Sequence, residues 1–335
     1  MKRKKSGFVF YFIISLLFSL IACSPSSNQS TSKIRLVEVT HSLFYTPQYI
    51  ALTKGFFKEQ GLEIELINGN GGDKTMTTLL ANQSDMILMG TEGAIYVTAR
   101  GANEPVMAFA QLTQTDGTFL LSRQPLASFT WDQLKGKKLL GQRRGGMPEM
   151  VSEYVQRKNG LRPHQDVEII QNVEFQNLGT AFASGTGDFV QLFEPVASKL
   201  EQEGKGRIVA SFGKDSGIVP YTVYMTKKSF LEKNPETVTR FVRALYQAQK
   251  WVQSHSTDEI VDAVTPHFKD IDRSILTSVI ERYKSQASWA PDPFIDEKEY
   301  NHLLEIMKQA GELPKEVPYQ QIVDTNISQR VIREQ

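Results

Sequence analysis

The stretch FYTPQYIALTKGFFKEQGLEIEL, residues 44–66, predicts a helix that leads directly into a strand. The apolar side chains of residues 47–60 recur at near-helical spacing: Tyr49, Ile50, Leu52, Phe56 and Phe57. Gly61 follows them, and glycine commonly ends a helix. Residues 63–67 then alternate polar and apolar side chains, as a strand does. A helix running into a strand is typical of a βαβ unit.

The same order of elements occurs in both halves of the chain. In each half a helix ends at a Gly-Leu pair, a strand and a second helix follow, and an aspartate then opens an apolar strand. The aspartates are Asp85 and Asp188, and a glutamate follows each strand, at Glu92 and Glu194. The Gly-to-Asp spacing is 24 residues in one half and 28 in the other. This pattern predicts an α/β fold with two similar βαβ lobes, each a parallel sheet covered by helices.

Two extended apolar segments, residues 117–122 and 219–226, are candidates for crossing between the lobes. The chain after them is mostly helical in pattern. The glycine-rich loop at residues 68–72 lacks the Lys-Ser/Thr of a phosphate loop and the spacing of a dinucleotide turn. We therefore expect no nucleotide cofactor.

The N-terminus has the pattern of an export signal. Residues 2–5 are basic, residues 8–22 form an apolar run, and Cys23 follows. A bilayer span takes roughly 20 apolar residues, so this run has the length of a signal. We expect residues 1–22 to be a lipoprotein signal peptide, Cys23 to be the lipidation site and residues 23–33 to be a lipid-anchored tether. A plain secretory signal with an incidental cysteine is the open alternative.

Composition excludes several classes of protein. Removal of residues 1–22 takes away four basic and no acidic residues, which leaves 34 Lys and Arg against 37 Asp and Glu, a net charge of −3. Nucleic-acid binding favours a strongly basic face, so no nucleic acid is expected as a partner. Cys23 is the only cysteine, which excludes disulfides within one chain and thiolate metal clusters.

Residues 44–66 resemble the first helix and second strand of the solute-binding proteins of ABC importers. The resemblance is to the branch that handles aliphatic sulfonates, taurine, nitrate and thiamine-pyrimidine precursors, and its pattern Ala-x3-Gly-Phe-Phe-x3-Gly-Leu starts at Ala51. Residues 80–85 and the pair Glu194-Pro195 also match this branch. The resemblance as a whole covers roughly residues 34–260. Pyrimidine synthases related to this branch rely on a cysteine-rich segment, which this chain lacks.

The resemblance implies a periplasmic-binding-protein fold of type II, with two lobes joined by a two-strand hinge. Lobe I would comprise residues 34–118 with 224–335, and lobe II residues 119–223. One small molecule would bind in the cleft between them. The pattern of the chain agrees, because ligands of open parallel sheets bind outside the carboxyl ends of the strands.

Candidate ligand contacts follow the first strand of lobe I. Phe44 and Tyr45 lie on a loop before a helix, where aromatic rings can cover a planar or aliphatic ligand; packing between helix and sheet is the alternative. His41 is a lone histidine, for which a structural hydrogen bond is the alternative. Thr91 and Glu92 follow the third strand, and Glu194 is the matching carboxylate of lobe II. All three could instead complement helix N-termini.

In lobe II the loop at residues 143–148 is the strongest candidate for ligand contact. Its glycines and the start of a helix can present backbone N–H groups, and Arg143 or Arg144 could grip a sulfonate or carboxylate; pairing with surface glutamates is the alternative. Met147 lies in the same loop. Gln111 and Asn172, each after a strand, are weaker polar candidates.

These features favour an extracytoplasmic solute-binding lipoprotein that delivers a small polar or anionic solute to an ABC importer. The arginines indicate a sulfonate- or taurine-like anion, whereas the glutamates and aromatic residues indicate an aminopyrimidine-like amine, and the sequence leaves both open. The expected partners are the solute, the ABC permease and its ATPase, and the membrane through the lipid. We expect a monomer on the outer face of the cell membrane, extracellular in a Gram-positive host or otherwise periplasmic.

The alternatives are a lipid-anchored enzyme and a sensor built on the same fold. The five histidines, at positions 41, 164, 255, 267 and 302, show no paired ligand spacing, and no Gly-x-Ser-x-Gly elbow occurs. We therefore expect no catalytic residues, no metal and no cofactor.

Overall fold

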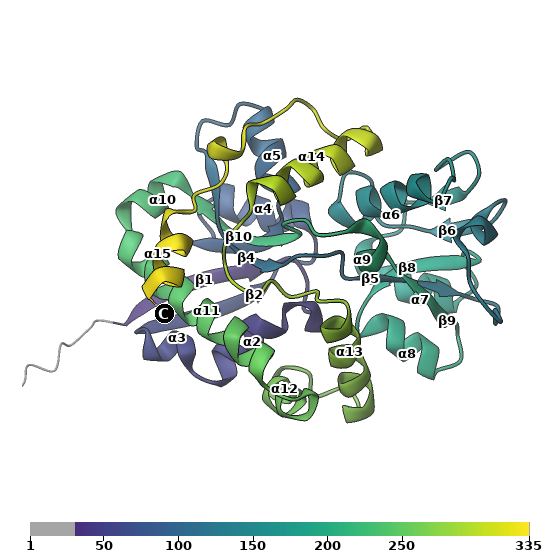
Figure 1. Ribbon diagram of the computed structural model, residues 1–335, viewed down its shortest axis with the longest axis horizontal. Helices are drawn as coiled ribbons and strands as arrows, with labels where there is room; N and C mark the ends of the chain where they lie inside the picture. Colours follow the sequence, from purple (N-terminus) through teal and green to yellow (C-terminus); the bar gives the residue numbers. More distant parts are fainter. Residues whose placement is uncertain (1–30, 335) are drawn as a thin grey trace, which may run out of the picture. The chain divides into compact units, whose positions relative to one another are not determined.

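The computed structural model describes residues 31–334. Figure 1 shows its helices and two groups of strands. The strands are β1 (Ser32–Glu38), β2 (Leu62–Asn68), β3 (Met86–Gly90), β4 (Val106–Thr113), β5 (Thr118–Ser122), β6 (Lys138–Leu140), β7 (Glu168–Ile170), β8 (Phe189–Phe193), β9 (Arg207–Ser211) and β10 (Thr222–Lys227).

The helices before β9 are α2 (Thr46–Thr53), α3 (Phe56–Glu59), α4 (Gly72–Leu80), α5 (Glu92–Ala99), α6 (Met147–Lys158), α7 (Leu178–Ala183) and α8 (Val196–Gln202). Those that follow are α9 (Phe212–Ser216), α10 (Lys228–Lys233), α11 (Pro235–Ser254), α12 (Thr257–Val264), α13 (Arg273–Ser285), α14 (Glu297–Ala310) and α15 (Asn326–Glu334). Short 3₁₀ turns are η1 (Leu43–Tyr45), η2 (Trp131–Leu134), η3 (Phe175–Asn177), η4 (Thr265–His267) and η5 (Tyr319–Gln321).

The strands form two five-stranded sheets of equivalent topology. The first has the order β2-β1-β3-β10-β4 and the second β7-β6-β8-β5-β9. In each sheet the first three strands are parallel, and the next strand, β10 or β5, is antiparallel to its neighbours. This topology confirms the predicted α/β class and two βαβ lobes. The expectation of wholly parallel sheets was wrong, because β10 and β5 run antiparallel to their neighbours.

The two aspartates of the sequence repeat occupy the same structural position. Oδ2 of Asp85 accepts a hydrogen bond from the backbone N–H of Arg35 at 2.9 Å, and Oδ2 of Asp188 accepts one from Lys138 at 2.9 Å. Each carboxylate therefore bonds to the backbone of the neighbouring parallel strand, β1 at Arg35 or β6 at Lys138. The repeat in sequence thus corresponds to a repeat in hydrogen bonding.

The chain passes between the sheets at residues 114–117 and 217–221, and the two passages are hydrogen-bonded to each other. The backbone N–H of Val219 donates to Gln114 O at 3.0 Å, and that of Tyr221 donates to Thr113 O at 3.1 Å. This is a two-strand hinge as predicted, but it lies a few residues before the predicted segments, because residues 118–122 form β5 and residues 222–226 lie in β10. The residue boundaries of the lobes that flank it stay a prediction.

The helix expected over residues 47–60 is two helices. Gly55 adopts φ +80° between α2 and α3, a left-handed conformation that glycine adopts without steric cost. The apolar residues nevertheless face the core as predicted, since Tyr49, Ile50 and Phe57 are all buried. They pack with the sheet residues Leu36 and Leu88 in one hydrophobic core.

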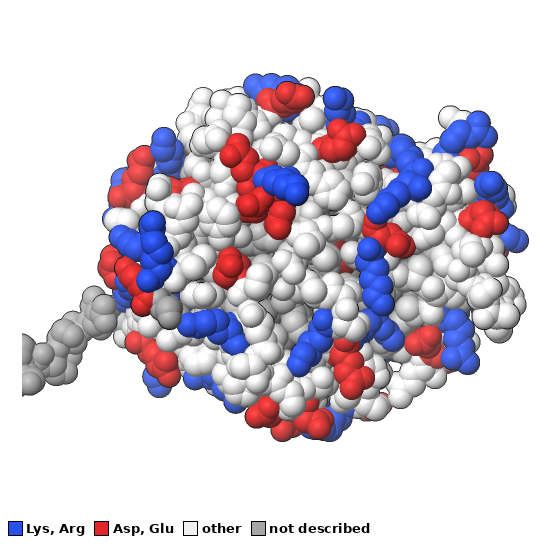
Figure 2. Space-filling view, viewed as in Figure 1, with Lys and Arg blue, Asp and Glu red and all other residues white. Residues whose placement is uncertain are grey.

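Charged side chains of both signs intermingle on the face drawn in Figure 2. Acidic and basic residues alternate over the described elements there without a broad patch of one sign. Among residues 31–334, no helix combines the length and the apolar character needed to cross a membrane. The predicted signal peptide and Cys23 lie outside the described residues.

Candidate functional site

A cavity of about 380 Å³ opens at the carboxyl ends of parallel strands from both sheets. Its wall includes residues that follow or end β1, β3, β6 and β8: Val39, Thr40, Met89, Gly90, Gln142 and Phe193. Ligands of open α/β sheets bind at such edges, and the volume lies within the range of small-molecule sites. The cavity is therefore the candidate solute site.

Glu92 is the buried carboxylate of the cavity wall. Its side chain folds back over the end of β3. The carboxylate lies so close to Gly90 that any side chain at position 90 would clash with it. Oε1 accepts a hydrogen bond from the backbone N–H of Met147 at 3.4 Å, whereas Oε2 has no partner among the described residues. Burial raises the pKa of Glu92 to about 7. A buried acceptor without a partner costs free energy, which makes Glu92 a candidate acceptor for a ligand.

Aromatic and methionine side chains make up most of the apolar wall. They come from both sheets and from the hinge passage: Tyr45, Met76, Met89, Tyr96, Met147, Phe175, Phe193 and Tyr221. Tyr45 and Tyr221 are almost completely buried, and burial raises the pKa of both hydroxyls. These hydroxyls therefore stay neutral donors and acceptors. Such a wall suits a planar ligand that stacks on rings.

Arg143 and Arg144 line the mouth of the cavity, and both are already paired. The Arg143 guanidinium forms an ion pair with Asp73 at the start of α4. Arg144 Nε donates to Glu312 Oε1 at 2.6 Å. Both arginine side chains are more than half exposed. Because each cation has a carboxylate partner, the loop presents less positive charge to a ligand than the sequence indicated.

Contacts across the cavity connect the layers of the two sheets. The hydroxyl of Tyr96, on α5, donates to Gly145 O at 3.0 Å, and Met147 at the start of α6 donates to Glu92. The pair Arg143–Asp73 makes a third connection. The loop at residues 143–147 is thus held against α4 and α5, so a solute in this cavity would be enclosed between the two layers.

The structure brings five of the eleven predicted ligand contacts to the cavity wall: Tyr45, Glu92, Arg143, Arg144 and Met147. Ligand contact by these residues stays a prediction. Phe44 lies directly behind the wall, since its buried ring packs on Phe193 and Tyr221 with centroid distances of 5.6 Å. It supports two lining rings and lies outside the lining itself.

His41 and Thr91 take part in other hydrogen bonds. His41 Nδ1 lies 2.9 Å from Glu38 Oε1, and its Nε2 lies 2.9 Å from His267 O. The Thr91 hydroxyl donates to Pro220 O in the hinge passage. The His41 contacts fit the structural alternative named for it. Thr91 precedes α5 but makes no side-chain cap hydrogen bond, so its contact with the hinge passage differs from the capping alternative.

Gln111, Asn172 and Glu194 also lie outside the cavity lining. Gln111 is buried in β4, where its backbone carbonyl oxygen accepts from Gln249 Nε2 at 2.9 Å, and Asn172 is exposed. Glu194 is buried and pairs with Arg282, and Ser198 N donates to its Oε2 at 2.9 Å. Glu194 therefore complements the start of α8, unlike its sequence counterpart Glu92.

Sequence reasoning did not single out several lining residues. Tyr96 had a usable signal, because it lies four residues after Glu92 and thus on the same face of α5. Tyr221 lies in the hinge passage, Phe175 in η3 and Phe193 at the end of β8. These residues are far apart in sequence, and the fold brings them to one cavity.

Residues 44–258 match the family model described as NMT1/THI5 like. A protein of Bacillus subtilis (strain 168) named YtlA, designated a binding protein, is 53% identical over 328 residues, which cover 98% of each chain. A 4-amino-5-hydroxymethyl-2-methylpyrimidine phosphate synthase of Saccharomyces cerevisiae, THI11, is 25% identical over 235 residues, 67% of this chain and 68% of the yeast protein.

Among solved structures, the chain is similar to the alkanesulfonate-binding protein SsuA from Xanthomonas axonopodis pv. citri bound to MOPS. The TM-score is 0.70 at 17% identity, and the match covers 88% of this chain and 99% of that one. At this identity the likeness shows the fold alone, which is the predicted type II fold of periplasmic binding proteins.

Proposed function

Because the chain belongs to the NMT1/THI5-like family, we propose that it is an extracytoplasmic solute-binding protein that delivers its ligand to an ABC importer. The 53% identity to a designated binding protein over nearly the whole chain supports this function. So does an enclosed cavity at the strand ends of two sheets joined by a hinge, since such lobes close around ligands.

The proposed ligand is a small heteroaromatic amine of the aminopyrimidine class. Glu92 carries this choice, because a buried carboxylate with an unpartnered oxygen requires a hydrogen-bond donor. Carboxylates accept from the exocyclic amino group of cytosine, which is itself an aminopyrimidine. The ring of Tyr96, which is partly exposed in the cavity wall, offers a stacking surface, and the buried rings of Tyr45 and Tyr221 complete the wall beside it. A sulfonate is disfavoured here, because the arginines are paired and Glu92 would repel it.

We further propose that the protein binds its ligand without transforming it. The synthases related to the family in yeast are matched over only part of this chain, at 25% identity. The single cysteine of this chain, Cys23, lies before the matched residues. We also propose that Cys23 carries the lipid anchor, which would hold the protein next to its permease at the outer face of the membrane.

A thermal-shift panel tests the proposal on the full-length chain. The probes are 4-amino-5-hydroxymethyl-2-methylpyrimidine, taurine, an alkanesulfonate and nitrate. A ligand at 100 times its dissociation constant stabilises a protein by about 2.7 kcal/mol, so the aminopyrimidine should raise the unfolding temperature. A shift with the sulfonate or nitrate alone would reverse the choice of ligand. No shift with any probe, together with turnover of one, would contradict a binding function.

A further inference from the structure

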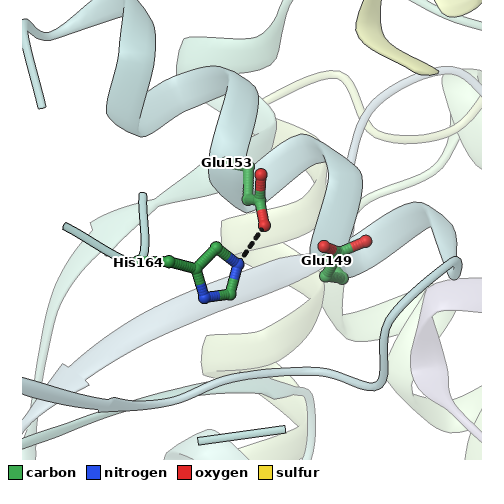
Figure 3. A group of neighbouring side chains, drawn as sticks. All are labelled: Glu149, Glu153 and His164. Carbon is green, nitrogen blue, oxygen red and sulfur yellow. Dashed lines mark hydrogen bonds and ion pairs between the residues drawn. The ribbon is translucent and has the colours of Figure 1, made fainter. Parts of the chain in front are cut away.

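Three side chains that could hold a metal ion converge beside the cavity loop. Glu149 and Glu153 lie four residues apart on α6, and His164 lies on the turn between α6 and β7; Figure 3 shows them together. One ligand atom from each lies within 4.8 Å of the others. Both glutamates are 3% exposed.

Neighbouring contacts hold all three side chains in place. Arg157 donates to Glu153 Oε2 at 2.7 Å, which leaves Oε1 facing His164 Nε2 at 2.7 Å. The backbone N–H of Gly145 donates to Glu149 Oε2 at 3.1 Å. The turn of His164 is fixed by Asp166, which accepts from the Arg162 backbone at 2.8 Å. Such second contacts are what orient metal ligands in proteins.

Two carboxylates of this cluster lie close together in a buried environment. Among the described residues, Arg157 and His164 pair with Glu153, whereas Glu149 has no ion-pair partner. Because two ionised carboxylates this close together repel each other, a cation bound between them would be stabilised.

Gln191 supplies a separate indication of a ligand. This side chain is completely buried and lines the same small cavity as Glu149 and Glu153. Its amide nitrogen donates to Thr118 Oγ1 and to Pro148 O, but its Oε1 has no partner among the described residues. A buried carbonyl oxygen without a donor is costly, and a cation would satisfy it.

We propose that Glu149, Glu153 and His164 form a binding site for one divalent transition-metal ion, with the carbonyl oxygen of Gln191 turned towards it. Mixed carboxylate and imidazole donors suit Zn²⁺ and Co²⁺ better than Ca²⁺ or Mg²⁺. The ion would tie α6 to the turn that carries His164. Through Glu149 and Gly145 it would also fix the start of the loop that lines the solute cavity. The site itself does not depend on the identity of the solute.

The test is titration of the full-length chain carrying Cys23→Ser, so that no thiol can bind metal. Co²⁺ is followed by visible absorption and Zn²⁺ by calorimetry. We expect one ion to bind per chain. Glu153→Gln and His164→Ala should each bind it at least tenfold more weakly, and the visible spectrum of bound Co²⁺ should differ between the parent and each variant. His302→Ala, a partly exposed histidine on α14, is the matched control and should bind as the parent does.

Circular dichroism of each variant separates loss of the site from loss of the fold, and His164→Gln is a second variant should His164→Ala unfold. The absence of saturable binding with either metal at millimolar concentration would overturn the site. So would binding that Glu153→Gln and His164→Ala leave unchanged, because the ion would then be held adventitiously at the surface.

Discussion

Oε1 of Glu92, at the start of α5, accepts a hydrogen bond from the backbone N–H of Met147, at the start of α6, over 3.4 Å. The two helices follow strands of different sheets, so this bond joins the two layers directly at the cavity. The same carboxylate keeps its second oxygen without a partner among the described residues. We propose that Glu92 both helps to enclose the cavity and recognises the ligand bound there.

The variant Glu92→Gln keeps the size of the side chain and removes its charge. We expect it to weaken aminopyrimidine binding by about 10- to 100-fold, because a hydrogen bond to a charged group contributes about 1.5–3 kcal/mol. Titration calorimetry measures the change. Glu281→Gln, on the exposed side of α13, is the control and should leave the affinity unchanged. Equal affinity of Glu92→Gln and the parent would remove Glu92 from the site.

Glu92 also makes stability depend on pH. Its pKa is raised from 4.5 to about 7 in the folded chain, so the folded state retains a proton that the unfolded state has lost between those values. Stability therefore falls as pH rises from 4.5 through 7. The nearby hydroxyls of Tyr45, Tyr96 and Tyr221 stay protonated there, because burial raises the pKa of each.

Urea unfolding at pH 5 and pH 8 tests this contribution by comparing the parent with Glu92→Gln. The parent should lose roughly 3 kcal/mol more than the variant between the two pH values, since one pKa unit corresponds to about 1.36 kcal/mol. Identical losses in both proteins would show that the Glu92 carboxyl does not titrate in this range.

Arg143→Gln tests whether the arginine loop grips the ligand. Because Arg143 is paired with Asp73 in an exposed position, its contribution should be that of a surface ion pair, about 0.2–1 kcal/mol. We therefore expect at most about a fivefold loss of solute affinity, with a similar loss in Asp73→Asn. A loss of 30-fold or more in Arg143→Gln alone would show direct contact with an anionic ligand.

Much of the fold could be predicted because the sequence pattern is local. Asp85, Asp188 and the strands that they open follow from apolar runs and their spacing, and the structure gives both aspartates the same hydrogen bond. The hinge passages lie a few residues before the apolar segments expected for them, because those segments form β5 and β10. The break at Gly55 was missed because apolar spacing continues through it; only the backbone angle marks the end of α2.

The candidate site was less predictable because pairing across the fold decides it. Glu92 and Glu194 occupy matching positions in sequence, but Arg282 and Ser198 satisfy Glu194, whereas Glu92 keeps an oxygen without a partner. Asp73 and Glu312 neutralise the arginines from 70 and 168 residues away. No local pattern contains such partners.

Cys23→Ser tests the proposed anchor. Without the thiol no thioether to diacylglycerol can form, so the chain should be released into the medium or remain unprocessed. Membrane fractionation followed by mass spectrometry of the N-terminal peptide distinguishes these results from the parent. A processed Cys23→Ser chain that stays in the membrane fraction would rule out lipid attachment at this residue.

The most direct measurement is calorimetric titration of the full-length chain with 4-amino-5-hydroxymethyl-2-methylpyrimidine, with mass spectrometry of the small molecule afterwards. The proposed function predicts one molecule bound per chain, with micromolar or tighter affinity, about −8 kcal/mol, and recovery of the ligand unchanged. Saturable binding of an alkanesulfonate with no binding of the aminopyrimidine, or recovery of a converted product, would contradict it.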